Sequence, residues 1–320
     1  MKTVFMHIGA GKTGSSAIQS FLTINQNQLK DIGFYYPLTP TANMAKNFKT
    51  TSGNSVELSK LLNSEIIEKR KIKHFIYELI NDAEGKNIVL SSENLCSFKE
   101  KNAVLLKKYF KRKKYQVVIV YYVRAIADIL VSNYHQQIKR KNYTGTFNSI
   151  INKNRIGFLK IIQKCLAVFD DNVILKNYDK AKKDIFLDFL NNVLQISDTR
   201  SFTIENKVVN RSLTPHELAF MRHMNKYFTD FRESTLISNT LIHDLPDLSY
   251  RLSIGKDDLA ELKNMYTQQI ESINTYLDEN EKPLTLVDDL QITEDPTHIS
   301  LNPFQESVVA ILAMLTKRSF

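Results

Sequence analysis

The N-terminal segment constrains the fold more than any other part of the sequence. A short apolar run, Thr3 to Ile8, ends at Gly9 and is followed by small residues in the order GAGKTGSS. An amphipathic stretch comes next, and its apolar positions recur at helical spacing: Ile18, Phe21, Leu22 and Leu29. An apolar run, a glycine-rich turn and an amphipathic segment predict a strand, a tight loop and a helix. The chain is therefore expected to begin as an α/β protein.

Further short apolar runs repeat this alternation along the chain. They cover residues 87–91, 117–123 and 173–175, and helical patterns separate them. The helical pattern between residues 55 and 81 has one predicted break, near Lys71. Apolar runs between helices are typical of buried parallel strands. The sequence therefore predicts a doubly wound, mostly parallel sheet with flanking helices, as in P-loop-like folds.

Beyond about Ser197 the pattern becomes mainly helical. Helical spacing is found at residues 215–228, 256–277 and 304–315, and polar loops join these segments. The sequence has no internal repeat and no long, compositionally biased linker. We therefore expect one domain over residues 1–320, with an α/β core at 1–213 and a helical extension of the same domain at 214–320.

Composition and hydropathy bear on where the protein works. A membrane-spanning helix needs about 18 or more apolar residues, and no run in the sequence approaches that length. Glycines and a lysine interrupt the N-terminal apolar run too early for a signal peptide. These features predict a cytoplasmic protein in which Cys96 and Cys165 are reduced core residues. The net charge of +9 fits a protein that binds anions, although a solvated basic surface accounts for it equally well.

The glycine-rich loop has the chemistry of an anion-binding site. Backbone N–H groups at the start of a helix attract negative charge, and Lys12 adds an ammonium group. Ser15 or Ser16 is expected to cap the helix. The Walker A pattern requires a glycine five residues before Gly11, where this chain has Met6. Because no strand-end aspartate for magnesium is evident either, the loop is expected to serve something other than ATP hydrolysis.

Three segments carry a resemblance to a known family. They are HIGAGKTGSSAIQSFL at 7–22, N-x-x-x-L at 25–29 and G-x-x-Y-P at 33–37. Together they resemble the N-terminal signature of bacterial sulfotransferases that use 3′-phosphoadenosine 5′-phosphosulfate (PAPS), which would make 1–213 a nucleotide-binding core. The resemblance implies that the loop binds the 5′-phosphosulfate and that Lys12 neutralises charge on the bridging oxygen. The implied loop contacts are Gly11, Lys12, Thr13, Gly14, Ser15 and Ser16.

A second phosphate site is implied by residues farther along the chain. Arg124 follows the apolar run VVIVYYV, and Ser132 lies eight residues later in a predicted helix. This pair resembles the family's 3′-phosphate motif, and an arginine fork can donate two charge-assisted hydrogen bonds to a phosphate. Asn210 and Arg211 resemble a late family segment, in which Arg211 is a candidate second contact to nucleotide phosphate.

Glu93 is the candidate general base. It lies in Ser-Ser-Glu-Asn at the end of a predicted strand and resembles the family's Ser-x-Glu segment. A hydroxyl group is a poor nucleophile until a base takes its proton, and glutamate or histidine suits that step. His7 and His135 are the alternative bases, and a helix-capping or ion-pairing role for Glu93 also stays open.

The resemblance implies sulfuryl transfer from PAPS to a hydroxyl acceptor, with adenosine 3′,5′-bisphosphate (PAP) as product and no metal. The family suggests a saccharide or glycan precursor as the acceptor. Two alternatives stay open: an ATP-dependent small-molecule kinase with Thr13 on magnesium, and a non-enzymatic protein that binds polyanions. The absence of tryptophan and of interleaved aromatic and basic residues argues against a nucleic-acid partner. The oligomeric state is left open.

Overall fold

Five short strands pair into one sheet in the computed structural model of the chain, which describes residues 1–39, 53–153, 155–204, 212–244, 252–294 and 300–317. The strands are β1 (Lys2–His7), β2 (Phe34–Tyr35), β3 (Asn87–Ser91), β4 (Tyr115–Val123) and β5 (Val173–Asn177). Their order in the sheet is β2-β3-β1-β4-β5, and every neighbouring pair is parallel. The predicted mostly parallel α/β sheet is confirmed.

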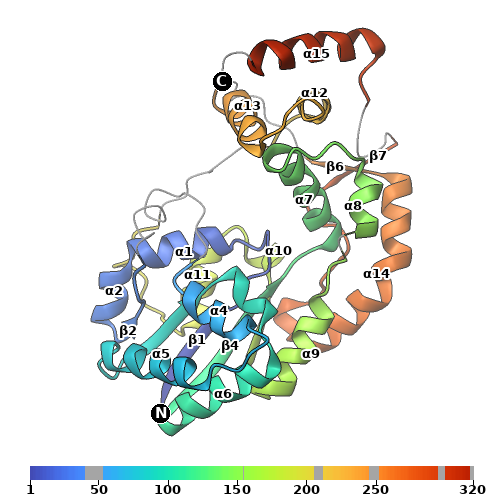
Figure 1. Cartoon of the computed structure of the whole chain (residues 1–320). Helices are drawn as coiled ribbons and strands as arrows, with labels where there is room; N and C mark the ends of the chain where they lie inside the picture. The colour runs from blue at the N-terminus through green and yellow to red at the C-terminus, as the bar shows by residue number, and fades with distance from the viewer. Residues whose placement is uncertain (40–52, 154, 205–211, 245–251, 295–299, 318–320) are drawn as a thin grey trace. The chain divides into compact units, whose positions relative to one another are not determined.

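The chain divides into two units, each assembled from separate stretches of sequence. The first unit comprises Met1–Arg124, Gly157–Asn206 and Ser272–Leu284, and the second comprises Ala125–Ile156, Lys207–Glu271 and Thr285–Phe320. The five-stranded sheet belongs to the first unit (Figure 1). The helix that directly follows Arg124 belongs to the second unit, although the sequence pattern grouped it with the α/β core. The single-domain organisation stays a prediction.

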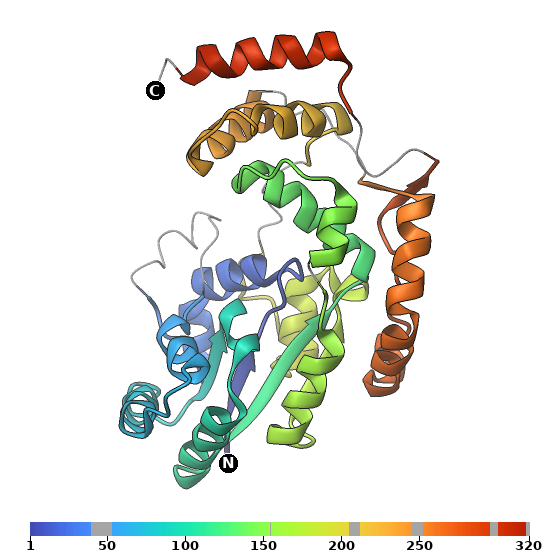
Figure 2. The same cartoon turned by 45° about the vertical axis from the view of Figure 1, so that its right-hand side comes forward.

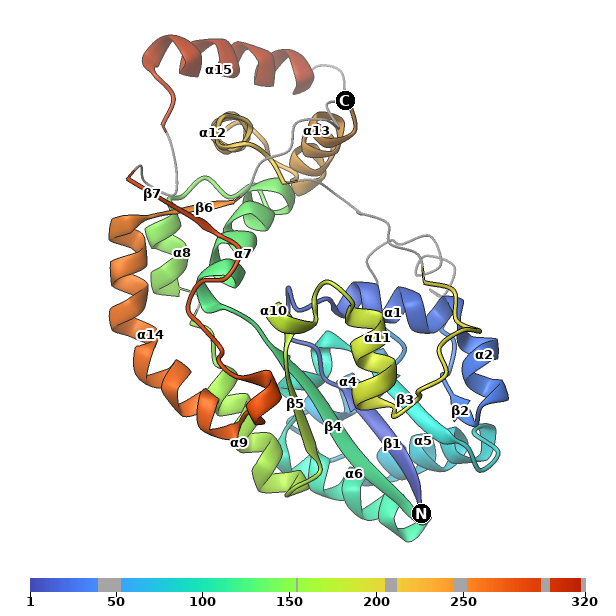
Figure 3. The same ribbon diagram turned by 180° about the vertical axis from the view of Figure 1, so that it is seen from behind.

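Helices cover both faces of the sheet in the first unit. They are α1 (Ser15–Ile24), α2 (Gln26–Asp31), α4 (Val56–Asn63), α5 (Lys69–Asp82), α6 (Glu100–Arg112), α9 (Phe158–Phe169), α10 (Tyr178–Ala181) and α11 (Ile185–Asp188). Short 3₁₀ helices lie at Glu93–Ser97 and Glu279–Glu281, and a π-helical turn lies at Phe189–Val193. In Figure 1, α5 and α6 lie in front of the sheet. Figure 3 shows the molecule from behind, where α11 lies over the opposite face of the sheet.

Adjacent residues of β4 illustrate how both faces become buried. The Tyr121 ring packs edge-on against Phe158 of α9, with ring centroids 5.9 Å apart. The next residue, Tyr122, points to the other face, where it joins the apolar cluster formed by α1, α11 and the π-helical turn. Both tyrosines are fully buried. Side chains alternate between the two faces of a strand, so covering both faces requires the continuous apolar sequence that predicted this strand.

The second unit is mainly helical. It contains α7 (Ile126–Arg140), α8 (Phe147–Lys153), α12 (Pro215–Met224), α13 (Phe231–Asp244), most of α14 (Lys256–Tyr276) and α15 (Pro303–Lys317). Two short strands, β6 (Ser253–Gly255) and β7 (Gln291–Thr293), pair in parallel. Helix α15 lies along α12 (Figure 2), where Val309 and Ala313 are buried against Met224 and Phe228.

Several local expectations differ from the structure. Lys71 lies inside α5, and the helix break falls at residues 64–68, where Ser64 is extended and its hydroxyl accepts a hydrogen bond from the Ile66 N–H. Such local side-chain bonds compete with helix formation. Helices α8 and α13 and the pair β6 and β7 were not predicted. Cys165 is buried as expected, whereas Cys96 is only partly buried, and both thiols are free. Among the described helices, none combines the length and apolar character required to cross a membrane.

Candidate functional site

The carboxyl ends of four strands lie at the same edge of the sheet in the first unit. Hydrogen bonds align these ends: the Ile8 N–H donates to Val120 O at 3.0 Å, and the Ser92 N–H donates to His7 O at 3.1 Å. The segments that leave the edge carry the glycine-rich loop after β1, Glu93 after β3, Arg124 after β4 and Asp179 after β5. Ligands of open α/β sheets bind at this edge.

The glycine-rich loop is closed by its own hydroxyl groups. The Thr13 hydroxyl donates to Ala10 O at 2.7 Å, and the Ser15 hydroxyl donates to the same oxygen at 3.3 Å. Helix α1 begins at Ser15, and its N-cap is Gly14 in the left-handed conformation, with φ 76°. The prediction that Ser15 or Ser16 caps this helix is therefore wrong. Glycine has no side chain with which to satisfy the first-turn N–H groups, which is the arrangement that suits a bound anion.

Two glycines of the loop lie where no side chain fits. A Cβ added to Gly9 would lie 2.1 Å from Ser15 Oγ and 3.5 Å from Glu93 Cγ. A Cβ added to Gly14 would lie 2.4 Å from Ile185 Cδ1 and 2.9 Å from Tyr178 Cε2. The loop therefore has no room for a side chain at Gly9, beside Ser15, or at Gly14, beside the residues that follow β5.

Glu93 lies in the first turn of the 3₁₀ helix that follows β3. The Ser92 hydroxyl caps this helix by accepting from the Asn94 N–H at 3.3 Å, so Glu93 is not the capping residue. Burial raises the pKa of the Glu93 carboxyl above its ordinary value, and the positive charge of Lys12 partly opposes the rise. The opposing charge links the predicted base to the predicted loop lysine. A raised pKa makes the carboxylate a stronger base, which suits a group that must accept a proton from a hydroxyl.

Arg124 is joined to the loop by a direct hydrogen bond. Its Nη1 donates to the Lys12 carbonyl oxygen at 2.9 Å. Its Nε lies 3.6 Å from Asp179 Oδ1, and its Cζ lies 5.0 Å from the centre of the Tyr178 ring. The structure therefore brings both Glu93 and Arg124 to Lys12, although Arg124 lies 112 residues away from Lys12 in the sequence.

The two alternative bases are both buried and neutral. His7 bonds through Nδ1 to Ser91 Oγ at 2.9 Å, and burial lowers the pKa of His7 to about 4. His135 lies on α7 in the second unit, where burial, with a contribution from Lys139, lowers the pKa of His135 to about 3. Full burial separates both imidazoles from solvent, so Glu93 is the better candidate.

All the predicted nucleotide contacts remain predictions, and some of them lie in the second unit, outside the described residues or at the protein surface. Ser132 lies on α7 in the second unit and is partly exposed. Arg211 and Asn210 fall outside the described residues. Ser16 lies in the first turn of α1 and is partly exposed, whereas Ser15 is buried.

The second unit also contains a cluster of three carboxylates. In the second unit, carboxylate oxygens of Asp128, Asp288 and Asp289 lie within 4.8 Å of one another. The two oxygens of Asp128 already accept the backbone N–H groups of Asp288 and Asp289, at 3.0 and 2.9 Å. This cluster therefore has a structural role in holding the 285–290 segment against α7.

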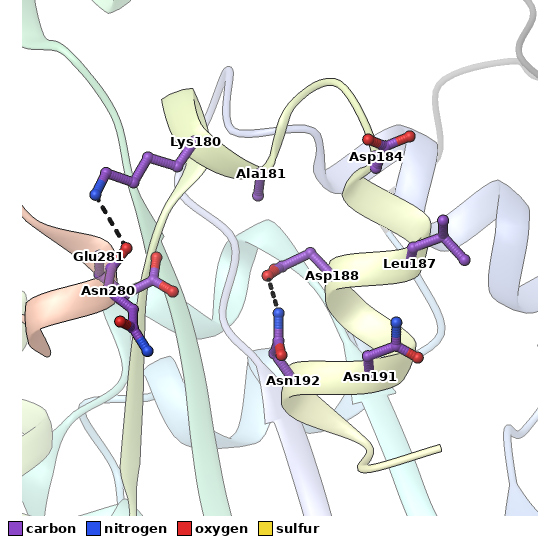
Figure 4. Close-up of a pocket in the computed structure, with 9 residues that line it drawn as sticks. All are labelled: Lys180, Ala181, Asp184, Leu187, Asp188, Asn191, Asn192, Asn280 and Glu281. Carbon is purple, nitrogen blue, oxygen red and sulfur yellow. Dashed lines mark hydrogen bonds between the residues drawn. The ribbon is translucent and has the colours of Figure 1, made fainter. Parts of the chain in front are cut away.

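A polar cavity of about 370 Å³ lies beside α10 and α11 in the first unit (Figure 4). Its lining residues are Lys180, Ala181, Asp184, Leu187, Asp188, Asn191, Asn192, Asn280 and Glu281. Lys176 forms ion pairs with both Asp188 and Glu281. No predicted site residue lines this cavity, and two of its carboxylates are engaged in holding β5.

The sequence interpretation missed Asp179. Tyr178 and Asp179 directly follow β5. The available signal was position, because a Tyr-Asp pair at the carboxyl end of a predicted strand lies at the ligand edge of the sheet. The pairing of Asp179 with Arg124 depends on strand order, which the sequence pattern alone does not supply.

Comparisons with known proteins give matches among solved structures only. No protein-family model matches the chain, and no curated protein matches it. A sulfotransferase from Alicyclobacillus acidocaldarius is 13% identical, with 70% of this chain and 93% of that chain covered and a TM-score of 0.35. A mouse sulfotransferase complexed with PAP is 16% identical, with 71% of this chain and 65% of that chain covered and a TM-score of 0.33. A retinol dehydratase in complex with androsterone and the inactive cofactor PAP is 12% identical, with 71% and 65% covered and a TM-score of 0.29.

Proposed function

We propose that this protein is a PAPS-dependent sulfotransferase that transfers a sulfuryl group to a hydroxyl acceptor. The observation that carries the proposal is the convergence of Lys12, Glu93 and Arg124 on one glycine-rich loop at the carboxyl edge of a parallel sheet. The loop supplies uncapped helix N–H groups and a cation for one phosphate. Arg124 supplies a fork-shaped donor for another.

The donor would be held through its two phosphate ends. The backbone of Gly11 to Ser16 and the ammonium group of Lys12 would bind the 5′-phosphosulfate, and Arg124, Ser132 and Arg211 would bind the 3′-phosphate. The absence of room for a Cβ at Gly9 and Gly14 fits a loop that must pass close to its ligand. Bound PAPS supplies an activated sulfuryl group whose leaving group is PAP.

The chain's own residues would then carry the transfer. The acceptor oxygen forms a bond to sulfur while the bond from sulfur to the bridging oxygen breaks, and the acceptor proton passes to Glu93. Lys12 and the loop N–H groups stabilise the negative charge left on the 5′-phosphate of PAP. Positioning and electrostatic stabilisation provide the rate enhancement, as in phosphoryl transfer.

The acceptor and the location belong to the same proposal. A saccharide or glycan precursor is proposed on the loop's resemblance to the carbohydrate-type bacterial enzymes. A cytoplasmic location is proposed because both thiols are free.

Ligand stabilisation tests the proposal against its two alternatives. PAP is expected to raise the melting temperature, because a ligand at about 100 times its Kd adds about 2.7 kcal/mol to the stability of the folded state. Arg124→Ala should lose most of this gain, while Arg200→Ala, which removes an exposed arginine of the same unit, should keep it. Stabilisation by Mg-ATP but not by PAP would indicate the kinase. Stabilisation by an oligonucleotide alone would indicate a polyanion-binding protein.

A further inference from the structure

The Arg124 side chain is held on two edges and one face. Its Nε lies 3.6 Å from Asp179 Oδ1, its Nη1 donates to Lys12 O at 2.9 Å, and the Tyr178 ring lies 5.0 Å from Cζ. The Arg124 and Asp179 side chains are only 16% and 7% exposed. A guanidinium group is planar, so contacts on two of its edges fix both its position and the direction of its plane.

Lys12, the loop residue at the other end of this arrangement, has an unusual backbone conformation. Its φ is 69°, in the left-handed region that non-glycine residues seldom adopt. Such a conformation persists where the surrounding structure holds it. The hydrogen bond from Arg124 to the Lys12 carbonyl is a contact that holds it here.

We infer that Asp179 is a positioning residue for the nucleotide phosphates, acting through Arg124 on both the 3′-phosphate site and the conformation of the loop at Lys12. The inference rests on the proposed function, because it assigns Asp179 to the same PAPS site. Asp179 is not assigned a contact with the sulfuryl group or with the acceptor hydroxyl. It fixes Arg124, and Arg124 in turn fixes Lys12.

A simpler role for Asp179 predicts the opposite change in the affinity for PAP when Asp179 is removed. If Asp179 only neutralised the partly buried charge of Arg124, its removal would make the site more positive and strengthen anion binding. If Asp179 orients Arg124, its removal weakens phosphate binding in spite of the added positive charge. The direction of the change in affinity therefore separates the two roles.

Calorimetric titration with PAP provides the test, on the wild-type chain and four variants: Asp179→Ala, Asp179→Asn, Arg124→Ala and Asp179→Ala/Arg124→Ala. Asp179→Ala is expected to weaken PAP binding by about tenfold. Asp179→Asn should weaken it by less, about threefold, because the amide keeps the size of the side chain and a partly negative oxygen facing Nε. Asp184→Asn is the matched control, since Asp184 is exposed and lies five residues farther along the chain; it should bind PAP like the wild type.

The double variant shows whether Asp179 acts through Arg124. In the Arg124→Ala background, Asp179→Ala should change the Kd for PAP by less than about twofold. The inference would be overturned if Asp179→Ala still lowered the affinity for PAP tenfold in the Arg124→Ala background. It would also be overturned if both single Asp179 variants bound PAP as tightly as the wild type or more tightly. Circular dichroism and thermal melting show whether Asp179→Ala folds. If it does not, the direction of the change in PAP affinity in Asp179→Asn decides between the two roles. Failure of the wild-type chain to bind PAP would overturn the proposed function and this inference with it, whereas wild-type binding without the variant pattern overturns this inference alone.

Discussion

Glu93 and Lys12 show how a side chain's surroundings prepare it for chemistry. Glu93 follows β3 at the sheet edge that carries the loop, where burial raises the pKa of its carboxyl and the positive charge of Lys12 partly opposes that rise. A carboxyl group in such a place is a stronger base than an exposed one, and the positive charge of the nearby ammonium group favours its ionised form. Two residues that the sequence offered as separate candidates are thus electrostatically linked.

Replacing Glu93 separates proton transfer from nucleotide binding. Glu93→Gln keeps the size and burial of the side chain but removes the base, so kcat should fall by about a hundredfold to ten-thousandfold. The Kd for PAP should change little, because Glu93 is not assigned a contact to the nucleotide. Steady-state kinetics and calorimetry measure the two quantities. Unchanged kcat would remove Glu93 from the catalytic role.

The same substitution should alter how stability depends on pH. Because the pKa of Glu93 is higher in the folded than in the unfolded chain, its contribution favours folding below the unfolded pKa and is lost as pH rises through the folded pKa. Glu93→Gln should therefore melt at a higher temperature than the wild type at neutral pH. The difference should shrink as pH falls through the unfolded pKa of about 4.3 and vanish near about pH 3, where the carboxyl is protonated in both states. Melting curves across this range test the direction, and a less stable variant at neutral pH would contradict it.

The loop between β1 and α1 depends on contacts from a distant element. Gly14 adopts a positive φ and lies against Tyr178 and Ile185, which follow β5. The N-terminus of α1 is thereby fixed relative to the segment that also carries Asp179. Two elements far apart in the sequence therefore shape the proposed phosphate site.

Gly14→Ala tests this dependence. The substitution adds both backbone strain and a steric clash, so the free energy of unfolding should fall by roughly 2–5 kcal/mol. Gly33→Ala is the matched control, since Gly33 has a φ of 87° but no atom within 4 Å of an added Cβ. Its cost should be limited to roughly 1–2 kcal/mol of backbone strain. Chemical denaturation measures the free energy of unfolding of both variants. Equal losses of stability would show that the contact of Gly14 with α10 and α11 is unimportant.

The sequence predicted the elements that depend on local pattern and failed where distant contacts decide. Strands β1, β3, β4 and β5 and the glycine-rich loop follow from apolar runs and turn residues, and the structure has them where they were expected. The helix cap was assigned to Ser15 or Ser16 by local rules, but the Ser15 hydroxyl bonds to Ala10 and the cap falls on Gly14. Asp179 was missed because its partner Arg124 comes from the neighbouring strand β4.

In the molecule as a whole, the chain returns to its first unit after it has left it. Residues 272–284 belong to that unit, although the sequence pattern assigned them to a C-terminal extension. Glu281 anchors this return: it forms an ion pair with Lys176, and its Oε2 accepts from the Asn177 N–H at 2.7 Å. Asp188 completes a buried network around Lys176, whose Nζ lies 2.8 Å from Asp188 Oδ1.

Glu281→Ala should destabilise the protein by about 3–5 kcal/mol, because it removes one partner of a buried ion-pair network and leaves the Asn177 N–H unsatisfied. Glu279→Ala is the control, since Glu279 is exposed and pairs only with Lys282 at 2.8 Å in the contacts of the described chain. Its effect should be much smaller. Urea denaturation measures both, and similar losses would mean that Glu281 does not anchor this segment.

Transfer of radiolabelled sulfur is the direct test of the proposed sulfotransferase activity. The protein is incubated with sulfur-labelled PAPS and a panel of hydroxyl-bearing saccharides, and in parallel with ATP labelled at the γ-phosphate. The wild-type chain is expected to place the sulfur label on a saccharide with formation of an equal amount of PAP, and Glu93→Gln should not. Transfer of the γ-phosphate from ATP to an acceptor, with no transfer of sulfur, would contradict the account.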